Sequence, residues 1–100
     1  MIHILSFCTN PEILPVMDRL VNKHSDDWTG YRAPDLATAR RVLAERRIDC
    51  VLLGAGTGRE EQEALLADLA PDAHTPVFIH HYGGGSGLLY AEVEQALAGR

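Results

Sequence analysis

The stretch Ile48–Gly58, "IDCVLLGAGTG", decides the fold. Its centre, Cys50–Leu53, is apolar at every position, which is typical of a strand that helices cover on both faces. Small residues follow Leu53 and predict a tight turn, and the chain beyond the turn carries leucine at helical spacing. A buried strand that leads through a turn into a helix is one unit of a parallel α/β domain.

The same strand-then-helix plan occurs four times along the chain. Strands are predicted at Ile2–Phe7, Trp28–Tyr31, Cys50–Leu53 and residues 76–81. Right-handed crossovers between parallel strands place helices on both faces of the sheet. We therefore predict one α/β domain over residues 1–100, a three-layer sandwich with a (βα)₄ plan and a four-stranded parallel sheet in the order 2-1-3-4.

Capping residues mark where the helices are expected to begin. The predicted caps are Asn10 with Pro11 in the first turn, Asp35, Thr57 with Glu60 as a capping box, and Ser86. The expected buried face of the first helix is Ile13, Val16, Met17, Leu20 and Val21.

Composition limits the class of function. The chain has 100 residues, of which 46% are hydrophobic and 23% charged, and its formal net charge is −5. An acidic chain with scattered basic residues weighs against nucleic acid as a partner. No apolar stretch is long enough to span a bilayer and no signal segment opens the sequence, so we expect a cytoplasmic protein with reduced cysteines and no membrane contact.

Three segments, "TNPEILPVMDRLV" (9–21), "LATARRVLAERRIDCVLLG" (36–54) and "TPVFIHHYG" (75–83), resemble response-regulator receiver domains. The resemblance implies a flavodoxin-like fold. A receiver has an acidic pair where this chain has Cys8 and Thr9, its phosphoacceptor aspartate where this chain has Gly54, and a hydroxyl residue where this chain has His81. Phosphotransfer needs carboxylates to hold Mg²⁺ and to accept the phosphoryl group. The resemblance therefore implies a non-catalytic regulatory or protein-interaction domain.

"HILSFC" and "CVLLGAG" also resemble the lactose/cellobiose-type B components of sugar phosphotransferase systems. In that family Cys8 would carry the phosphoryl group. However, Pro11 lacks an N–H donor and Glu12 adds negative charge where a phosphate would sit. A phosphocarrier is therefore the alternative hypothesis.

The glycine-rich stretch Tyr82–Gly87, "YGGGSG", has two interpretations: a structural turn, or a set of backbone N–H groups that binds a small anion. His80 and His81 are adjacent on a strand and should face opposite sides of the sheet, so we predict no metal site and no cofactor. The candidate ligand contacts at the carboxyl ends of the strands are Cys8, Thr9, Asn10, Gly54, Gly56, His81, Gly83, Gly84, Gly85 and Ser86.

A fifth strand, which receivers have beside the fourth, is missing here. The strand over residues 76–81 would then be an unprotected edge open to another chain. We expect a homodimer, or docking of another protein, through Val77, Ile79, Tyr82, Leu88 and Tyr90.

Overall fold

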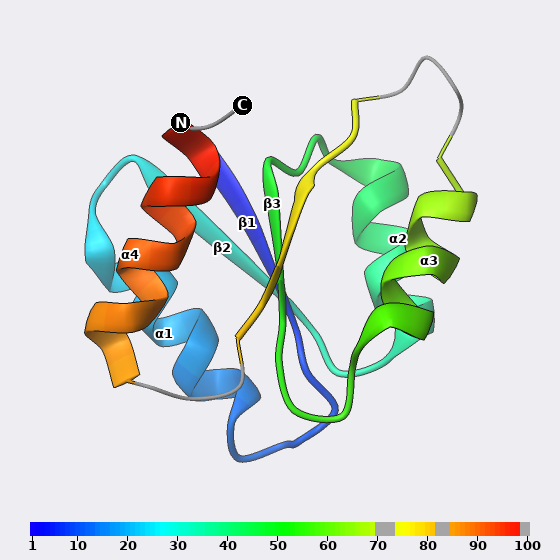
Figure 1. The fold of residues 1–100 in the computed structure, drawn as a ribbon, viewed down its shortest axis with the longest axis horizontal. Helices are drawn as coiled ribbons and strands as arrows, with labels where there is room; N and C mark the ends of the chain where they lie inside the picture. The colour runs from blue at the N-terminus through cyan, green and yellow to red at the C-terminus, as the bar shows by residue number, and fades with distance from the viewer. Residues whose placement is uncertain (70–73, 82–84, 99–100) are drawn as a thin grey trace.

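Four strands alternate with four helices in the computed structural model, which describes residues 1–69, 74–81 and 85–98 (Figure 1). The elements are β1 (Ile2–Phe7), α1 (Leu14–His24), β2 (Trp28–Ala33), α2 (Leu36–Glu45), β3 (Cys50–Leu53), α3 (Arg59–Ala67), β4 (Val77–His80) and α4 (Gly85–Ala98). The predicted strand-then-helix plan is confirmed.

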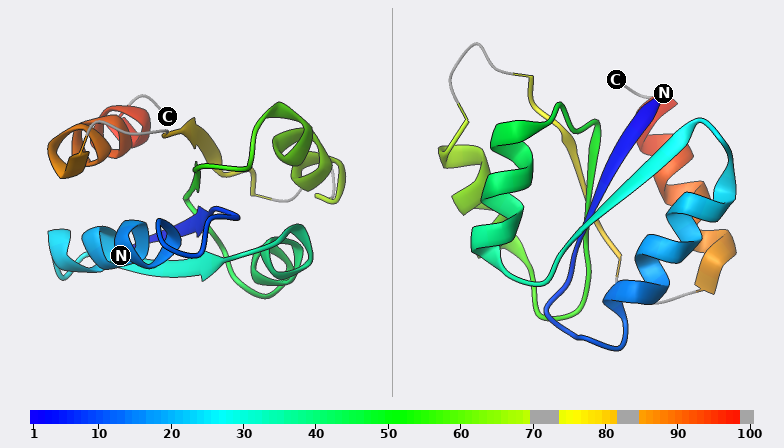
Figure 2. Two further views of the ribbon diagram at one scale, coloured as in Figure 1. Left: turned by 90° about the horizontal axis from the view of Figure 1, so that it is seen from below. Right: turned by 180° about the vertical axis from the view of Figure 1, so that it is seen from behind.

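The strands form one parallel sheet in the order β2-β1-β3-β4, as predicted. Helices α1 and α4 cover one face, and α2 and α3 cover the other, so the molecule is a three-layer α/β sandwich of flavodoxin-like type (Figures 1 and 2). Strand β1 lies between β2 and β3, and its Ile4 is in register with Gly30 and with Cys50. The outer strands are β2 and β4.

Two apolar clusters fill the spaces between the sheet and the helices. On the α1/α4 face, Ile4 and Leu52 pack with Met17, Leu89 and Val93. The cluster on the other face contains Leu5, Phe7, Val51, Leu53 and Leu65. All of β3 is buried because its residues alternate between the two clusters. This explains the unbroken apolar run from which the fold was predicted.

Helix α1 begins later than predicted. The Asn10 side chain accepts hydrogen bonds from the N–H groups of Glu12 (2.8 Å) and Ile13 (3.3 Å), so it caps a turn that precedes the helix. The face that α1 buries consequently contains Leu14, while Ile13 and Val16 are each 40% exposed. The prediction that Ile13 and Val16 belong to the core was wrong.

Two further predicted caps were also wrong. Helix α3 begins at Arg59 without a side-chain cap. The buried Thr57 hydroxyl instead donates to the carbonyl of Gly54 at 2.8 Å, because that acceptor lies inside the same turn. Helix α4 begins at Gly85, so Ser86 lies within its first turn rather than before it.

Asp35 caps α2 as predicted and supplies a test of this assignment. Its carboxylate accepts the N–H of Thr38 at 2.7 Å, and this hydrogen bond holds the pKa of Asp35 below its ordinary value. A carboxyl group whose pKa is lower in the folded chain than in the unfolded chain stabilises the fold at pH values above its unfolded-state pKa. This stabilisation is lost as the pH falls through the folded-state pKa. We expect Asp35→Ala to lower the melting temperature at neutral pH, with the difference from wild type shrinking in acid.

Asp35→Asn is the matched control, because asparagine is an equally good cap that does not titrate. It should melt close to wild type at pH 7, as followed by circular dichroism. If Asp35→Ala lowered the melting temperature by the same amount at pH 7 and at pH 2, this would contradict a cap that depends on the charge of Asp35.

Candidate functional site

The carboxyl ends of β1, β3 and β4 meet at one end of the molecule, which we call the carboxyl edge (residues 8–13, 54–58 and 81; the lower end in Figure 1). Backbone hydrogen bonds continue past the strand ends: Gly54 N–H donates to Phe7 (2.9 Å), Thr9 N–H to Ala55 (3.0 Å) and His81 N–H to Leu53 (2.8 Å). Most of the residues predicted to contact a ligand therefore lie close together at the carboxyl edge.

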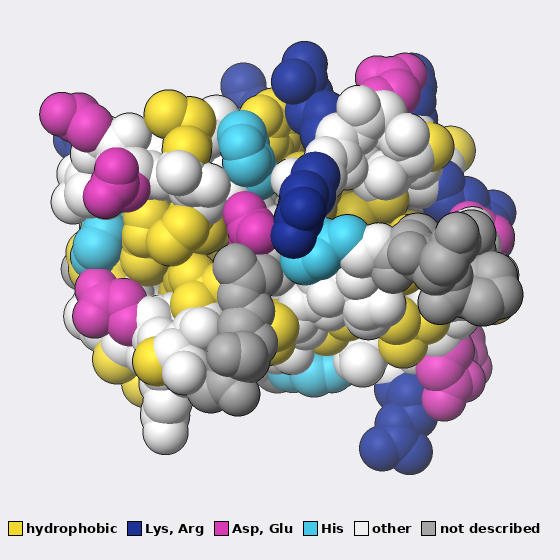
Figure 3. Space-filling model, turned by 90° about the horizontal axis from the view of Figure 1, so that it is seen from above, with side chains coloured by type: hydrophobic (Ala, Val, Ile, Leu, Met, Phe, Trp, Pro, Cys, Tyr) yellow, Lys and Arg dark blue, Asp and Glu magenta, His cyan; other side chains and the backbone are white. Residues whose placement is uncertain are grey.

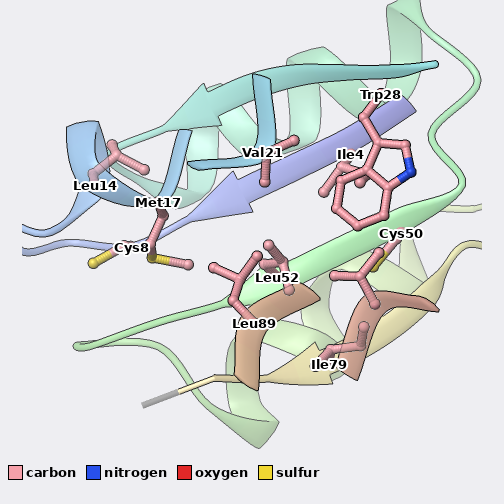
Figure 4. Packing of buried hydrophobic residues seen from close by; sticks show 11 residues of the cluster. Ile4, Cys8, Leu14, Met17, Val21, Trp28, Cys50, Leu52, Ile79 and Leu89 are labelled. Atoms are coloured by element: carbon pink, nitrogen blue, oxygen red, sulfur yellow. The ribbon is translucent and has the colours of Figure 1, made fainter. Parts of the chain in front are cut away.

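Side chains fill the space beside Gly54. A Cβ atom at this position would lie 2.8 Å from Met17 Sδ and 3.2 Å from Cys8 Cβ. Figure 4 shows Met17 and Cys8 side by side at one end of the buried cluster. Gly54 thus allows α1 to approach the end of β3, and a side chain at this position would require Met17 to move.

Thr9 and Gly56, which were both predicted ligand contacts, lie together and pack against each other. Gly56 has a φ of 83°, a conformation that favours glycine. A Cβ atom there would lie 1.6 Å from Thr9 Oγ1. The Thr9 hydroxyl donates to the Ala55 carbonyl at 3.3 Å, so the loop after β1 interlocks with the loop after β3.

Cys8 is fully buried between these loops. Its thiol donates to the carbonyls of Ala55 (3.4 Å) and Asn10 (3.7 Å). Cys50 is also buried and unoxidised at the opposite end of β3. The contacts of Cys8 are those of a small core side chain that lies close to a turn.

His81 and His80 face opposite sides of the sheet, as predicted. His81 is 9% exposed, and its Nδ1–H donates to Glu92 of α4 at 2.6 Å. His80 is exposed and contacts Gln62 of α3 at 2.7 Å. Glu92 was not among the predicted site residues, although it lies in the last helix and contacts His81. Tyr82, Gly83 and Gly84 lie outside the described residues.

The opposite end of the sheet, which we call the amino edge (residues 1–3, 45–49 and 74–77), gathers polar groups that the sequence did not reveal as a cluster. The buried Asp49 accepts the N–H of His3 at 2.8 Å, and its other oxygen lies 3.9 Å from His74 Nε2. His3 Nδ1 lies 2.9 Å from the Tyr31 hydroxyl. Figure 3 shows histidine, acidic and basic side chains together on this surface.

A groove of roughly 340 Å³ opens beside this cluster. Its lining is Leu43, Ala44, Glu45, Arg46, Arg47, Ile48, Leu69, His74 and Pro76. The adjacent pair Arg46 and Arg47 just before a buried strand was the available signal, since residues that precede a strand lie at its amino end. This pair was not predicted as part of a site, because ligands in parallel sheets usually bind at the carboxyl ends of the strands.

Over residues 1–69, 74–81 and 85–98, no three His, Cys, Asp or Glu side chains are arranged to hold a metal ion. None of the helices within these ranges has the length and apolar character needed to cross a membrane. The sequence matches no protein-family model, and no curated protein is similar to it.

The interlocked loops predict a contrast between two glycines. Gly56→Ala should destabilise the fold by roughly 1–3 kcal/mol from the positive φ alone, with the clash against Thr9 adding to this. Gly87→Ala in α4 meets no atom within 4 Å and should be neutral or stabilise by up to about 1 kcal/mol. Urea unfolding measures both.

The double variant Thr9→Ala/Gly56→Ala removes the closest clashing atom and should recover part of the loss. A Gly56→Ala variant as stable as Gly87→Ala would show that the two loops do not pack as described.

Proposed function

We propose that this chain is a non-catalytic regulatory or protein-interaction domain whose fold resembles that of receivers. The observation that carries the proposal is the packing at Gly54, where Met17 and Cys8 occupy the space that a phosphoacceptor side chain would need. Phosphoryl transfer to a receiver requires carboxylates around a bound Mg²⁺. Here the corresponding positions carry a buried thiol, a hydroxyl that donates to the Ala55 carbonyl, and glycine.

The alternative, a phosphocarrier that uses Cys8, has less support. A phosphoryl acceptor must reach its donor, and Cys8 is fully buried with its thiol directed at two carbonyl oxygens. Carbonyl oxygens repel a phosphate, whereas free N–H groups attract it. Glu12 lies exposed in the adjoining turn and adds negative charge. The site favours a packed structural thiol over a nucleophile.

Phosphorylation separates these hypotheses. We expect neither acetyl phosphate with Mg²⁺ nor a phosphohistidine donor to add a phosphoryl group to the folded chain, as judged by intact-mass spectrometry. Gly54→Asp should also stay unlabelled and should lower the melting temperature, because its carboxylate enters the space of Met17 and Cys8. An acid-labile phosphoaspartate on the wild-type chain would refute the proposal, and a phosphorylated Cys8 would establish the carrier.

A surface for a partner is proposed at β4 and the start of α4. The Val77 N–H donates to the Asp49 carbonyl and the His81 N–H donates to the Leu53 carbonyl, so both groups point toward β3. Because the N–H and C=O groups of successive residues in a strand point to alternate sides, those of Phe78 point away from β3. An outward-facing strand edge can pair antiparallel with its own copy, which gives a two-fold contact. Leu88 is 48% exposed at the start of α4, near this edge.

The predicted interface residues differ in their roles. Ile79 is 9% exposed and belongs to the core of one chain, with Val77 packed against the same cluster. Tyr90 packs across to α1, where its hydroxyl donates to the Leu20 carbonyl at 3.0 Å. Tyr82 lies outside the described residues. The proposed contact with a second copy therefore depends on the backbone of β4 and on Leu88.

Leu88→Glu tests this contact. Light scattering at low micromolar concentration should give about twice the mass of the 11.0 kDa chain for wild type and about one chain mass for the variant, because a charge at the two-fold contact opposes association. Leu66→Glu, on the α3 side and 37% exposed, is the matched control and should remain dimeric. A monomeric wild-type chain would refute the homodimer, and the partner at this surface would then be a different protein.

A further inference from the structure

The groove at the amino edge is lined by apolar side chains together with basic ones. Five of its lining residues are apolar: Leu43, Ala44, Ile48, Leu69 and Pro76. The polar remainder is Arg46, Arg47, His74 and Glu45. A volume of roughly 340 Å³ and a mainly apolar lining with a few polar groups are typical of sites for small organic molecules.

Arg47 and His74 are held in a defined arrangement. Arg47 Nη2 donates to His74 Nδ1 at 3.3 Å, so the imidazole acts as an acceptor and carries its proton on Nε2. This Nε2 is buried, without a hydrogen bond, and lies 3.9 Å from the Asp49 carboxylate. Asp49 thus favours the tautomer in which Nδ1 accepts from Arg47. The guanidinium keeps further N–H donors for a ligand.

The apolar wall continues between α2 and α3. A smaller cavity of about 50 Å³ shares Leu43, Ala44 and Leu69 with the groove and adds Leu65. An ion pair between Arg40 and Asp68, 2.6 Å apart, lies at this cavity and joins the two helices. The two spaces are neighbours that share the apolar side chains of Leu43, Ala44 and Leu69.

Charge selects the kind of molecule that fits. The whole chain has a net charge of −5, yet the groove is lined by two arginines and one glutamate. Arg46 lies 5.0 Å from the centre of the Tyr31 ring, and Arg47 contacts His74. An arginine fork pairs best with a carboxylate or a similar planar anion.

From this arrangement we infer that the amino edge binds a small amphiphilic carboxylate, with its anionic group at Arg47 and its apolar chain along Leu43 and Leu69. The groove does not share a lining residue with the proposed pairing surface at β4 and α4: it is formed by the end of α2, the segment before β3, Leu69 after α3, and His74 and Pro76 before β4. It gives the domain a ligand in place of a phosphoryl group.

Octanoate is the probe, and 1-octanol is its uncharged counterpart of equal chain length. In titrations of the ¹⁵N-labelled chain below the aggregation limit of either probe, the amide shifts should concentrate at residues 43–48, 69 and 74–77. Octanoate should bind about tenfold more tightly than octanol, since hydrogen bonds to a charged group favour the anion.

Arg47→Gln should reduce octanoate affinity about tenfold and leave octanol affinity unchanged. Arg59→Gln, an exposed arginine at the start of α3, is the matched control and should bind like wild type. Equal binding of the two probes, octanoate shifts confined to α1 or α4, or an Arg59→Gln loss as large as that of Arg47→Gln would each overturn the inference. The phosphorylation assay and the light-scattering measurement test the proposed function, and their outcomes do not depend on whether octanoate binds.

Discussion

Close contact between the Gly54 backbone and the side chains of Met17 and Cys8 controls the carboxyl edge of this domain. Because glycine has no Cβ, α1 can pack directly over the end of β3. The same approach brings the loop after β1 against the loop after β3, where Thr9 meets Gly56. A side chain at position 54 would require Met17 to shift.

The last helix depends on polar contacts as well as on the core. Leu89 and Val93 bury α4 against the sheet, and Glu92 accepts from His81 at the end of β4. On α1, His24 contacts Glu94 at 2.8 Å and stacks on Trp28 with ring centres 3.8 Å apart. These links join α4 to β4 and to α1 at the side of the sheet where β4 forms the edge.

The two ends of the sheet therefore differ in character. At the carboxyl edge, glycines and backbone hydrogen bonds draw the loops together into a packed surface. At the amino edge, Asp49 connects His3 and His74, and a groove remains beside Arg47. In parallel α/β domains the carboxyl ends are the usual binding region. Here one groove lies at the amino edge and a smaller cavity lies between α2 and α3.

The sequence allowed more than one doubly wound strand order, and the structure has the predicted one, 2-1-3-4. The sequence by itself determined the strand-then-helix order and the burial of β3. These features follow from apolar periodicity and from the handedness of crossovers, both of which are local or general. Asp35 was also recognisable as a cap, because a cap bonds within a few residues of itself. Only the tertiary structure decided that Thr57 bonds within its turn, that Ile13 stays exposed, and that Gly54 lies under Met17. The amino-edge cluster joins residues as distant as His3, Asp49 and His74, and such contacts depend on how strands align in space rather than on any spacing along the chain.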